Sequence, residues 1–295
     1  MKIGFFESRD EEEISFFKTY LPGHELNFND EPLVSENLTS DKQSLRSDDI
    51  KSLEAVAVFV NSRIDESVIN ALPNLKAIFL RATGFDNIDI AFCKQKNIVV
   101  SNVPAYGSHT VAEFTFALVL NVIRKVYTAI NRVKIEQRFS FEGLQGFDLF
   151  GKTLGVLGTG KIGLNVIKIA KGFGMNVLSF DAYPNQTAAN ELDFKYASLE
   201  ELLRSSDIVT IHVPYNSETH HLLNSTNLPL MKQGGFLINT SRGGVVETDA
   251  LFKALSSGHL AGAGLDVLEE EDELKEEAEL LSRNAIPEGS FKDIL

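Results

Sequence analysis

The stretch GTGKIG, residues 158–163, constrains the fold of this 295-residue chain more than any other feature. It follows the apolar run TLGVL and opens an amphipathic segment, and the next apolar run, MNVLSF, ends at Asp181. Glycines at these spacings let a strand turn tightly into a helix whose N-terminal amides bind a pyrophosphate, and an acid after the second strand binds a ribose. The pattern predicts a dinucleotide site with Gly158, Gly160, Gly163 and Asp181.

Asp181 also indicates which dinucleotide is bound. A carboxylate at this position would repel a 2′-phosphate, and no Arg follows it in DAYPN. We therefore expect NAD rather than NADP as the cofactor. The alternative is that the glycines serve only tight packing of strand against helix, but an acid at the end of the following strand favours a binding site.

Apolar runs without polar alternation occur in both halves of the chain and are typical of parallel strands covered on both faces. They lie at 2–6, 55–60, 75–80 and 97–102, and again at 153–158, 175–181, 207–214, 234–241 and 261–268. Helical stretches at 161–173, 198–205 and 247–257 separate the later runs. The expected fold is α/β, with a smaller flavodoxin-like domain at 1–103 and a Rossmann-type doubly wound parallel sheet at 104–295.

The segment SHTVAEFTFALVLNVIRKVYTAINRV, residues 108–133, is apolar around more of its circumference than a surface helix requires. Such a helix must be covered on several sides, so we expect it between the domains, with a contact between subunits as a further option. Glu113, Asn121 and Arg124 interrupt it too often for a membrane span.

Charge and cysteine content exclude several classes of function. The net charge of −13 argues against binding to nucleic acid, which needs clustered Lys and Arg. No apolar stretch has the form of a signal peptide or a membrane span, so we expect a cytoplasmic protein that does not bind membranes. The single Cys93 cannot form an internal disulfide and is expected to be a buried apolar residue. No metal site is expected.

Several ordered motifs together resemble the D-isomer-specific 2-hydroxyacid dehydrogenase family, within it the D-lactate dehydrogenase branch. They are RATGFDNID (81–89), NVPAYGSHTVAEF (102–114), GTGKIG (158–163), HVP (212–214), INTSRGGVVE (238–247) and GAGLDVLEEE (262–271). The resemblance covers essentially the whole chain. It implies an NAD domain inserted into a discontinuous substrate domain, of which residues 1–103 are the N-terminal part, a cleft between the two, and a homodimer built around the NAD domain.

The resemblance also implies roles for residues that match the family's motifs. On the cofactor side these are Lys161 and Ile162 under the pyrophosphate, Val213 and Pro214 along the adenine, and Thr219, Thr240, Arg242 and Asp266 completing the site. On the substrate side, Thr83 and Gly84 match the loop whose amides receive the substrate carboxylate, and Tyr106 matches a substrate-facing tyrosine.

Arg242 and Glu271 are the candidate catalytic residues. Arg242 follows the carboxyl end of a predicted strand, where its guanidinium fork can clamp the planar carboxylate of a 2-oxo or 2-hydroxy acid. The alternative is an Arg that caps a carbonyl or pairs with Asp266. In the family, the carboxylate that orients an acid–base His lies five residues after the Asp of LDV, which is Glu271 rather than Glu269 or Glu270. The acids that follow Glu271 are expected to form a solvated face.

The histidine that Glu271 would orient is missing from these 295 residues. In the resembling enzymes it lies downstream in a Pro-His loop, but no His follows His259 here, and His109 and His212 are the nearest substitutes. We therefore expect a truncated or partial version whose last residues lead toward a missing return to the substrate domain, or a natural variant without its proton donor. Either would bind NAD and turn over poorly, because general acid–base catalysis contributes about 10²–10⁴-fold.

The predicted reaction is NAD-dependent hydride transfer between a small D-2-hydroxy acid and its 2-oxo acid. Tyr106 and Phe85 suggest a modest pocket that suits pyruvate and D-lactate, although phosphoglycerate, glycerate and bulkier 2-oxo acids stay open. Two further interpretations compete with it. One is an NAD(H)-gated binding protein like the corepressors that share this fold, and the other is an inactive fragment.

Overall fold

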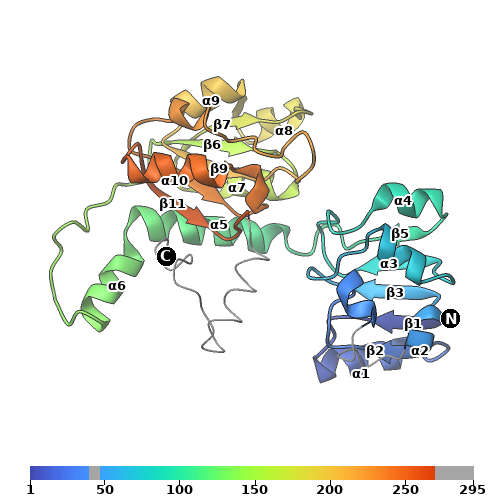
Figure 1. The fold of residues 1–295 in the computed structure, drawn as a ribbon. Coiled ribbons are helices and arrows are strands. Elements are labelled where there is room, and N and C mark those ends of the chain that lie inside the picture. Colours follow the sequence, from blue (N-terminus) through green and yellow to red (C-terminus); the bar gives the residue numbers. More distant parts are fainter. Residues whose placement is uncertain (40–46, 270–295) are drawn as a thin grey trace. The chain divides into compact units, whose positions relative to one another are not determined.

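The computed structural model describes residues 1–39 and 47–269. The chain divides into two compact units, Met1–Gly107 and Ser108–Leu295. This division lies close to the predicted boundary between residues 103 and 104. Each unit is built on its own parallel sheet, so the α/β class expected from the sequence is confirmed (Figure 1). Within the described residues, no helix is long and apolar enough to cross a membrane.

The first unit has the flavodoxin-like strand order β2-β1-β3-β4-β5. Its strands are β1 (Lys2–Phe5), β2 (Glu25–Phe28), β3 (Ala55–Val58), β4 (Ala77–Leu80) and β5 (Val99–Ser101). Its helices are α1 (Glu11–Tyr20), η1 (Ser35–Thr39), α2 (Ser47–Lys51), α3 (Glu66–Ala71) and α4 (Ile90–Gln95). Strand β2 was not predicted, because this short edge strand is only partly buried and carries no continuous apolar run.

The second unit has the strand order β11-β10-β9-β6-β7-β8, all parallel. Its strands are β6 (Thr153–Leu157), β7 (Asn176–Phe180), β8 (Lys195–Tyr196), β9 (Ile208–Ile211), β10 (Gly235–Asn239) and β11 (Leu260–Leu265). Its helices are α5 (Ser108–Ile123), α6 (Val126–Lys134), α7 (Lys161–Gly172), α8 (Gln186–Glu191), α9 (Leu199–Ser205), η2 (Leu228–Leu230), η3 (Gly243–Val245) and α10 (Thr248–Ser256). The chain starts in the middle of the sheet at β6, winds outward to β8 and returns to β9, which is the Rossmann arrangement.

Both faces of this sheet are covered, which explains why its central strands are apolar throughout. Helices α5 and α7 cover one face, where Phe116 and Val166 pack on Val156 and Ile238. Helices α9 and α10 cover the other face. The strand order changes direction between β6 and β9, and open α/β sheets bind their ligands beyond the carboxyl ends of the strands at such a point.

Side chains placed just before the helices fix where several of them begin. The side chains of Asp10, Asp65, Asp89, Asn185 and Ser198 each accept a hydrogen bond from a backbone amide in the first turn of the helix that follows. Short polar side chains at this position satisfy amides that the helix itself leaves unpaired. Among the α-helices of the second unit, α6, α7 and α10 lack such a cap at the N-cap residue, and α7 and α10 border the candidate site.

The apolar segment 108–133 forms two helices rather than one. The break falls at Lys125, which adopts a left-handed backbone conformation with φ of 52° and donates from Nζ to the carbonyl of Gly143. Helix α5 packs on the sheet through Ala112, Phe116 and Val119. Helix α6 and the chain after it extend away from the sheet (Figure 1).

Candidate functional site

The glycine-rich loop of residues 158–160, named here the phosphate loop, connects β6 to α7 at the centre of the second sheet. Gly158 has φ of +93°, and a Cβ there would lie 2.6 Å from the carbonyl oxygen of His212 at the end of β9. A Cβ on Gly163 would lie 2.0 Å from the carbonyl oxygen of Gly158. Both contacts are too short for any side chain, so these two positions require glycine for close approach of helix and strand.

The N-terminus of α7 has the properties of an anion site. Gly160 is the N-cap residue, no side chain caps the helix, and a Cβ on Gly160 would meet nothing within 4 Å. The helix thus begins beside open space at the switch point without a side-chain cap on its first amides, and the helix dipole favours a negative group there. Lys161 is exposed and Ile162 is half-buried at the start of this helix. The loop therefore fits the pyrophosphate of a dinucleotide.

Asp181, at the end of β7, is held by three donors. Its carboxylate accepts hydrogen bonds from the Thr159 amide at 2.6 Å, the Thr159 hydroxyl at 2.8 Å and the Tyr183 amide at 2.8 Å. Burial raises the pKa of Asp181, but the donors from Thr159 and Tyr183 outweigh burial and lower the pKa below its usual value. The carboxylate stays ionised, as a ribose-binding acid requires.

A hydroxyl network supports this arrangement from β8. Thr159 Oγ1 lies 2.8 Å from the Tyr196 hydroxyl, which also accepts a hydrogen bond from the Asn185 amide at 2.9 Å. Thr159 and Tyr196 have no clear signal in the sequence, because the dinucleotide motif leaves the second position of the loop open and β8 is only two residues long.

The segment after β9 carries three of the expected cofactor residues. The backbone of Val213 lies against Gly158, since a Cβ on that glycine would be 2.9 Å from the Val213 amide. The Thr219 hydroxyl donates to the Pro214 carbonyl at 2.6 Å and accepts from the Asn216 amide at 2.9 Å. Thr219 therefore closes the turn that begins at Pro214.

Arg242 lies in the turn after β10, and buried Asn239 shapes this turn. The Asn239 side chain accepts from the Ser241 amide at 3.0 Å and donates to the Arg242 carbonyl at 2.9 Å. The guanidinium of Arg242 donates to the Ser241 carbonyl at 2.9 Å, which is a contact expected of a carbonyl-capping Arg as well. An Asn at the end of a strand is a turn signal that could have identified Asn239 from the sequence.

Thr240 and Asp266 lie beside Arg242 at the carboxyl ends of β10 and β11. The hydroxyl of buried Thr240 lies 3.0 Å from that of Thr115 on α5, so it contacts this helix. The Asp266 amide donates to the Asn239 carbonyl at 2.9 Å, and its side chain is exposed. The expected cofactor residues of the second unit thus lie at one edge of one sheet.

The acidic stretch divides at residue 269. Glu271 lies outside the described residues, so its role stays a prediction. Glu269 is described and is half-buried: its carboxylate contacts His221 Nε2 and accepts from the Thr248 amide at 3.0 Å and the Thr248 hydroxyl at 2.7 Å. The sequence does not single out Glu269 among the neighbouring acids, because its partners come from distant parts of the chain.

His212, one of the two substitutes for a proton donor, is half-buried directly after β9, with its ring turned inward. Its two ring nitrogens are inaccessible and have no hydrogen-bond partner, and burial lowers the pKa of His212 to about 3. A neutral imidazole of this kind does not exchange protons near neutral pH. His109 lies in the first turn of α5.

The expected substrate residues belong to the first unit. Thr83 follows β4, where its hydroxyl donates to the Val103 carbonyl at 2.9 Å and its own carbonyl accepts from the Asn102 side chain at 2.8 Å. Gly84 is half-buried, whereas Tyr106 is exposed. The turn that holds Thr83 and Gly84 is thus fixed against the chain after β5.

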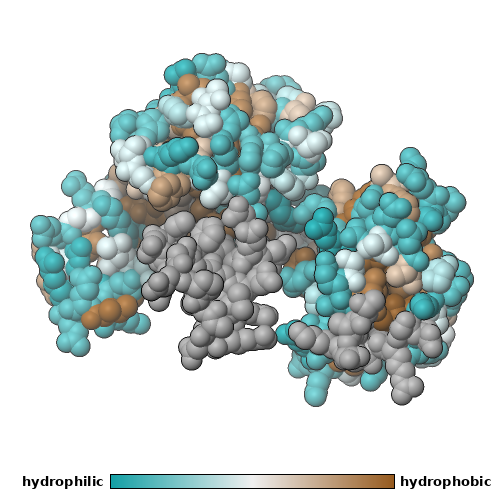
Figure 2. All heavy atoms as spheres, viewed as in Figure 1, coloured by the Kyte–Doolittle hydropathy of each residue, from teal (hydrophilic) through white to brown (hydrophobic). Residues whose placement is uncertain are grey.

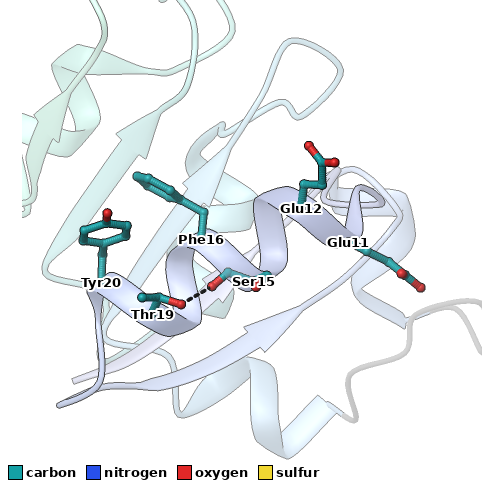
Figure 3. Close-up of a pocket in the computed structure, with 6 residues that line it drawn as sticks. All are labelled: Glu11, Glu12, Ser15, Phe16, Thr19 and Tyr20. Atoms are coloured by element: carbon teal, nitrogen blue, oxygen red, sulfur yellow. Dashed lines mark hydrogen bonds between the residues drawn. The ribbon is translucent and has the colours of Figure 1, made fainter.

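A separate depression lies along α1, where Phe16 and Tyr20 project to the same side of the helix and Glu11 and Glu12 lie at its start (Figure 3). Within this group of side chains the Thr19 hydroxyl bonds to the Ser15 carbonyl. It contains neither a cation nor a glycine-rich loop, so its chemistry does not match that of the site at β6 and β10.

Residues 116–286 match the family described as D-isomer specific 2-hydroxyacid dehydrogenase, NAD binding domain. A 2-hydroxyacid dehydrogenase homolog from Zymomonas mobilis is 38% identical over 278 residues, which cover 93% of this chain and 81% of the relative. A glyoxylate reductase from Korarchaeum cryptofilum is 40% identical over 225 residues, covering 75% of this chain and 68% of the relative.

The solved structures include a D-lactate dehydrogenase from Aquifex aeolicus in complex with NAD and lactic acid. It superimposes with a TM-score of 0.85 at 36% sequence identity. The matched region covers 97% of this chain and 82% of the Aquifex aeolicus chain. The likeness thus extends over both units.

Proposed function

Because the chain belongs to the D-isomer-specific 2-hydroxyacid dehydrogenase family, we propose that it interconverts a small D-2-hydroxy acid and its 2-oxo acid, with D-lactate and pyruvate as the pair. The family is one of NAD-dependent oxidoreductases, and NAD is the cofactor. The D-lactate dehydrogenase of Aquifex aeolicus, crystallised with lactic acid, supports this choice of substrate, and the glyoxylate reductase keeps a smaller 2-oxo acid in competition.

One observation carries the proposal. The open N-terminus of α7, the ionised Asp181 and the Arg242 turn lie at the carboxyl ends of strands of a single sheet. A dinucleotide and a small anion bound there would meet beyond the same edge. Bound NADH would supply the hydride.

The residues of this chain supply binding and orientation in the proposed reaction. The Arg242 guanidinium would hold the substrate carboxylate and polarise the neighbouring carbonyl oxygen. The amides of Thr83 and Gly84 would receive the same carboxylate, and Tyr106 would line the pocket. Glu271 would orient an acid–base imidazole, which these 295 residues do not contain in the expected place.

Binding and turnover of the 295-residue chain test the proposal. We expect NADH to bind, measured by its fluorescence, and oxamate, an unreactive isostere of pyruvate, to bind the NADH complex. Arg242→Gln should abolish oxamate binding and leave NADH binding intact. Pyruvate reduction by these 295 residues should be about 10²–10⁴-fold slower than is usual for such enzymes, because no His follows Glu271 within them to deliver the proton. Faster reduction of glyoxylate than of pyruvate would overturn the substrate assignment, and a full rate would contradict the expected defect.

A second candidate uses the same dinucleotide site. An NAD(H)-gated binding protein, in which the cofactor sets an assembly state, would bind NADH at the start of α7 without using the Arg242 clamp for turnover. A change in assembly on adding NADH, without any pyruvate reduction, would support this function over the dehydrogenase. A chain that binds neither NADH nor oxamate would be an inactive fragment.

The proposal includes a homodimer in the cytoplasm. Apolar side chains are exposed on α6 and the chain after it, among them Tyr127, Phe139 and Phe141, with 68%, 87% and 79% of their surface exposed. Apolar patches among hydrophilic ones are visible on this part of the molecule in Figure 2. Surfaces of this kind are typical of interfaces, so we assign them to contact with a second copy. The buried free thiol of Cys93 suits a reducing compartment.

A further inference from the structure

Three loops meet at the carboxylate of Glu269. The first is the His221 loop, residues 215–224, after β9. The second is the Arg242 loop, residues 240–247, between β10 and α10. The third is the chain after β11, which ends its described part at Glu269. The Glu269 side chain is only 20% exposed and that of His221 34%, so their contact is largely shielded from water.

Each oxygen of the Glu269 carboxylate binds a different element. Oε1 contacts Nε2 of His221, and Oε2 accepts from both the amide and the hydroxyl of Thr248 at 3.0 and 2.7 Å. Burial raises the pKa of Glu269, but the hydrogen bonds from His221 and Thr248 outweigh burial and lower the pKa, so the carboxylate is ionised.

Glu269 also caps α10, the helix that follows the Arg242 loop. The N-cap residue of α10 is Glu247, but its side chain makes no cap bond and instead accepts from the Ser225 amide at 2.7 Å. Thr248 is the first residue of the helix, so Glu269 supplies the missing acceptor from a distant part of the chain. A carboxylate here is also favoured by the helix dipole.

The Arg242 loop is enclosed on both sides. A Cβ on Gly243 would lie 2.0 Å from the carbonyl of Leu268 and 2.3 Å from the amide of Glu269, so the chain after β11 lies directly against the residue that follows Arg242. A Cβ on Gly244 would be 2.8 Å from the ring of Tyr215 in the His221 loop.

Backbone hydrogen bonds complete this enclosure. The His221 amide donates to the Gly244 carbonyl at 2.9 Å, and the Glu247 amide donates to Leu223 at 2.9 Å. Within the His221 loop, the ring of His221 stacks on that of His220 at a centroid distance of 3.9 Å, and His220 Nδ1 lies 3.1 Å from the Tyr215 hydroxyl. The contact of His221 with Glu269 therefore joins two ordered loops.

We propose that Glu269 is a positioning residue that joins the His221 loop to the start of α10 and thereby sets the orientation of Arg242 toward a substrate carboxylate. It does not touch the substrate. The inference rests on the proposed function, since it assigns Glu269 to the support of the Arg242 clamp. This role distinguishes Glu269 from the other acids of the stretch, because its carboxylate binds both the His221 loop and the first residue of α10.

Oxamate binding to the NADH complex tests the role of Glu269. We expect Glu269→Ala to weaken oxamate binding about tenfold, since a small misplacement of a clamp residue is costly, and to leave NADH binding unchanged. The oxamate affinity of Glu269→Gln should lie between those of the unaltered chain and Glu269→Ala. The amide oxygen of Gln can still accept from Thr248 but carries no charge for His221. Glu218→Ala, an exposed acid in the His221 loop, serves as the matched control and should bind oxamate like the unaltered chain.

A second variant separates positioning from simple capping of α10. Serine is a good N-cap residue, so Glu247→Ser in the Glu269→Ala background should restore the melting temperature without restoring oxamate affinity. Glu247→Ser alone, which also loses the hydrogen bond from the Ser225 amide, is the reference for both measurements. Oxamate affinity that returned together with the melting temperature would overturn the inference. In a double-mutant cycle, the effect of Glu269→Ala should shrink in a His221→Gln background, and fully additive effects would also count against it.

The outcomes distinguish this inference from the proposed function. If the unaltered chain bound no NADH, or bound NADH but no oxamate, the proposed function would be wrong and the inference would fall with it. If the unaltered chain bound both and Glu269→Ala bound them equally well, only the positioning role would be refuted.

Discussion

Thr159 is the residue that connects the loop between β6 and α7 to Asp181, the proposed ribose-binding acid. Its amide and hydroxyl both donate to Asp181, and its hydroxyl also contacts Tyr196. The amide donor is present whichever residue occupies position 159, but the hydroxyl donor depends on the side chain. The identity of this side chain therefore affects how firmly Asp181 is held for a ribose.

Thr159→Val should weaken NADH binding. The variant keeps the shape of the side chain but removes one hydrogen bond to Asp181, which is worth about 1 kcal/mol or about fivefold in the dissociation constant. Thr159→Ser retains the hydroxyl and should bind NADH like the unaltered chain. NADH fluorescence titrations measure both, and equal affinities for the Val and Ser variants would contradict the role of the hydroxyl.

His212 makes the fold sensitive to acid. Burial lowers the pKa of His212 to about 3 in the folded chain, whereas the unfolded chain binds the proton near pH 6.5. Between these values the unfolded state carries more protons, so stability falls as the pH falls. From pH 7.5 to pH 5 the free energy of unfolding should drop by about 2 kcal/mol through this group alone.

Urea unfolding at several pH values measures this dependence. His212→Asn should flatten the slope between pH 7.5 and pH 5, whereas His24→Asn, at an exposed His just before β2, should leave the difference due to His212 in place. A slope that persisted unchanged in His212→Asn would show that another group carries it. Carboxylates with lowered pKa values, such as Asp181 and Asp207, add their own loss only at lower pH.

At the scale of the elements, the position of helix α7 is set by its close contact with the loop that follows β6. Gly163 lies against the Gly158 carbonyl with no room for a Cβ, whereas a Cβ on Gly172 at the other end of the same helix would meet nothing within 4 Å. Close packing against the phosphate loop therefore requires glycine at position 163 but not at position 172. Only Gly163 would affect where the first amides of the helix lie relative to a phosphate.

Gly163→Ala should push α7 away from β6. We expect a loss of stability of about 1–3 kcal/mol from overpacking and a clear loss of NADH binding, because the helix amides move with the helix. Gly172→Ala is the control and should be neutral or stabilising by up to about 1 kcal/mol, since alanine favours helix. Thermal unfolding and NADH titration measure both effects. Normal NADH binding by Gly163→Ala would contradict the proposed placement of the pyrophosphate.

At the scale of the whole molecule, the exposed apolar surface on α6 and the following chain requires an explanation. The net charge of −13 opposes random association of such a chain. A specific interface would therefore have to bury these side chains, and the proposal of a homodimer supplies one.

Light scattering after size-exclusion chromatography tests the dimer. The unaltered chain should have twice the mass of one chain, and Phe139→Asp with Phe141→Asp should give a monomer, because burying two carboxylates in an apolar interface is unfavourable. Phe16→Asp, at an exposed aromatic residue of α1, is the control and should remain dimeric. If the unaltered chain had the mass of a monomer, the proposed homodimer would be refuted.

The sequence alone determined the fold class, the family and the cofactor. Glycine spacing, an acid at the end of the next strand and apolar runs are local properties, and each follows from what the backbone near those residues can adopt. Elements with weak local signals were missed. Strands β2 and β8 are short and lie at sheet edges, and the break at Lys125 interrupts a segment whose apolar pattern runs on without a change.

The tertiary structure decided which polar side chains act together. Thr159 and Tyr196 support Asp181, Asn239 shapes the Arg242 turn, and Glu269 joins His221 to Thr248. None of these pairings has a characteristic spacing, because parallel strands bring residues together through crossovers of variable length. The sequence could mark Glu269 only as one acid among many, and its partners became identifiable when three loops met at one edge of the sheet.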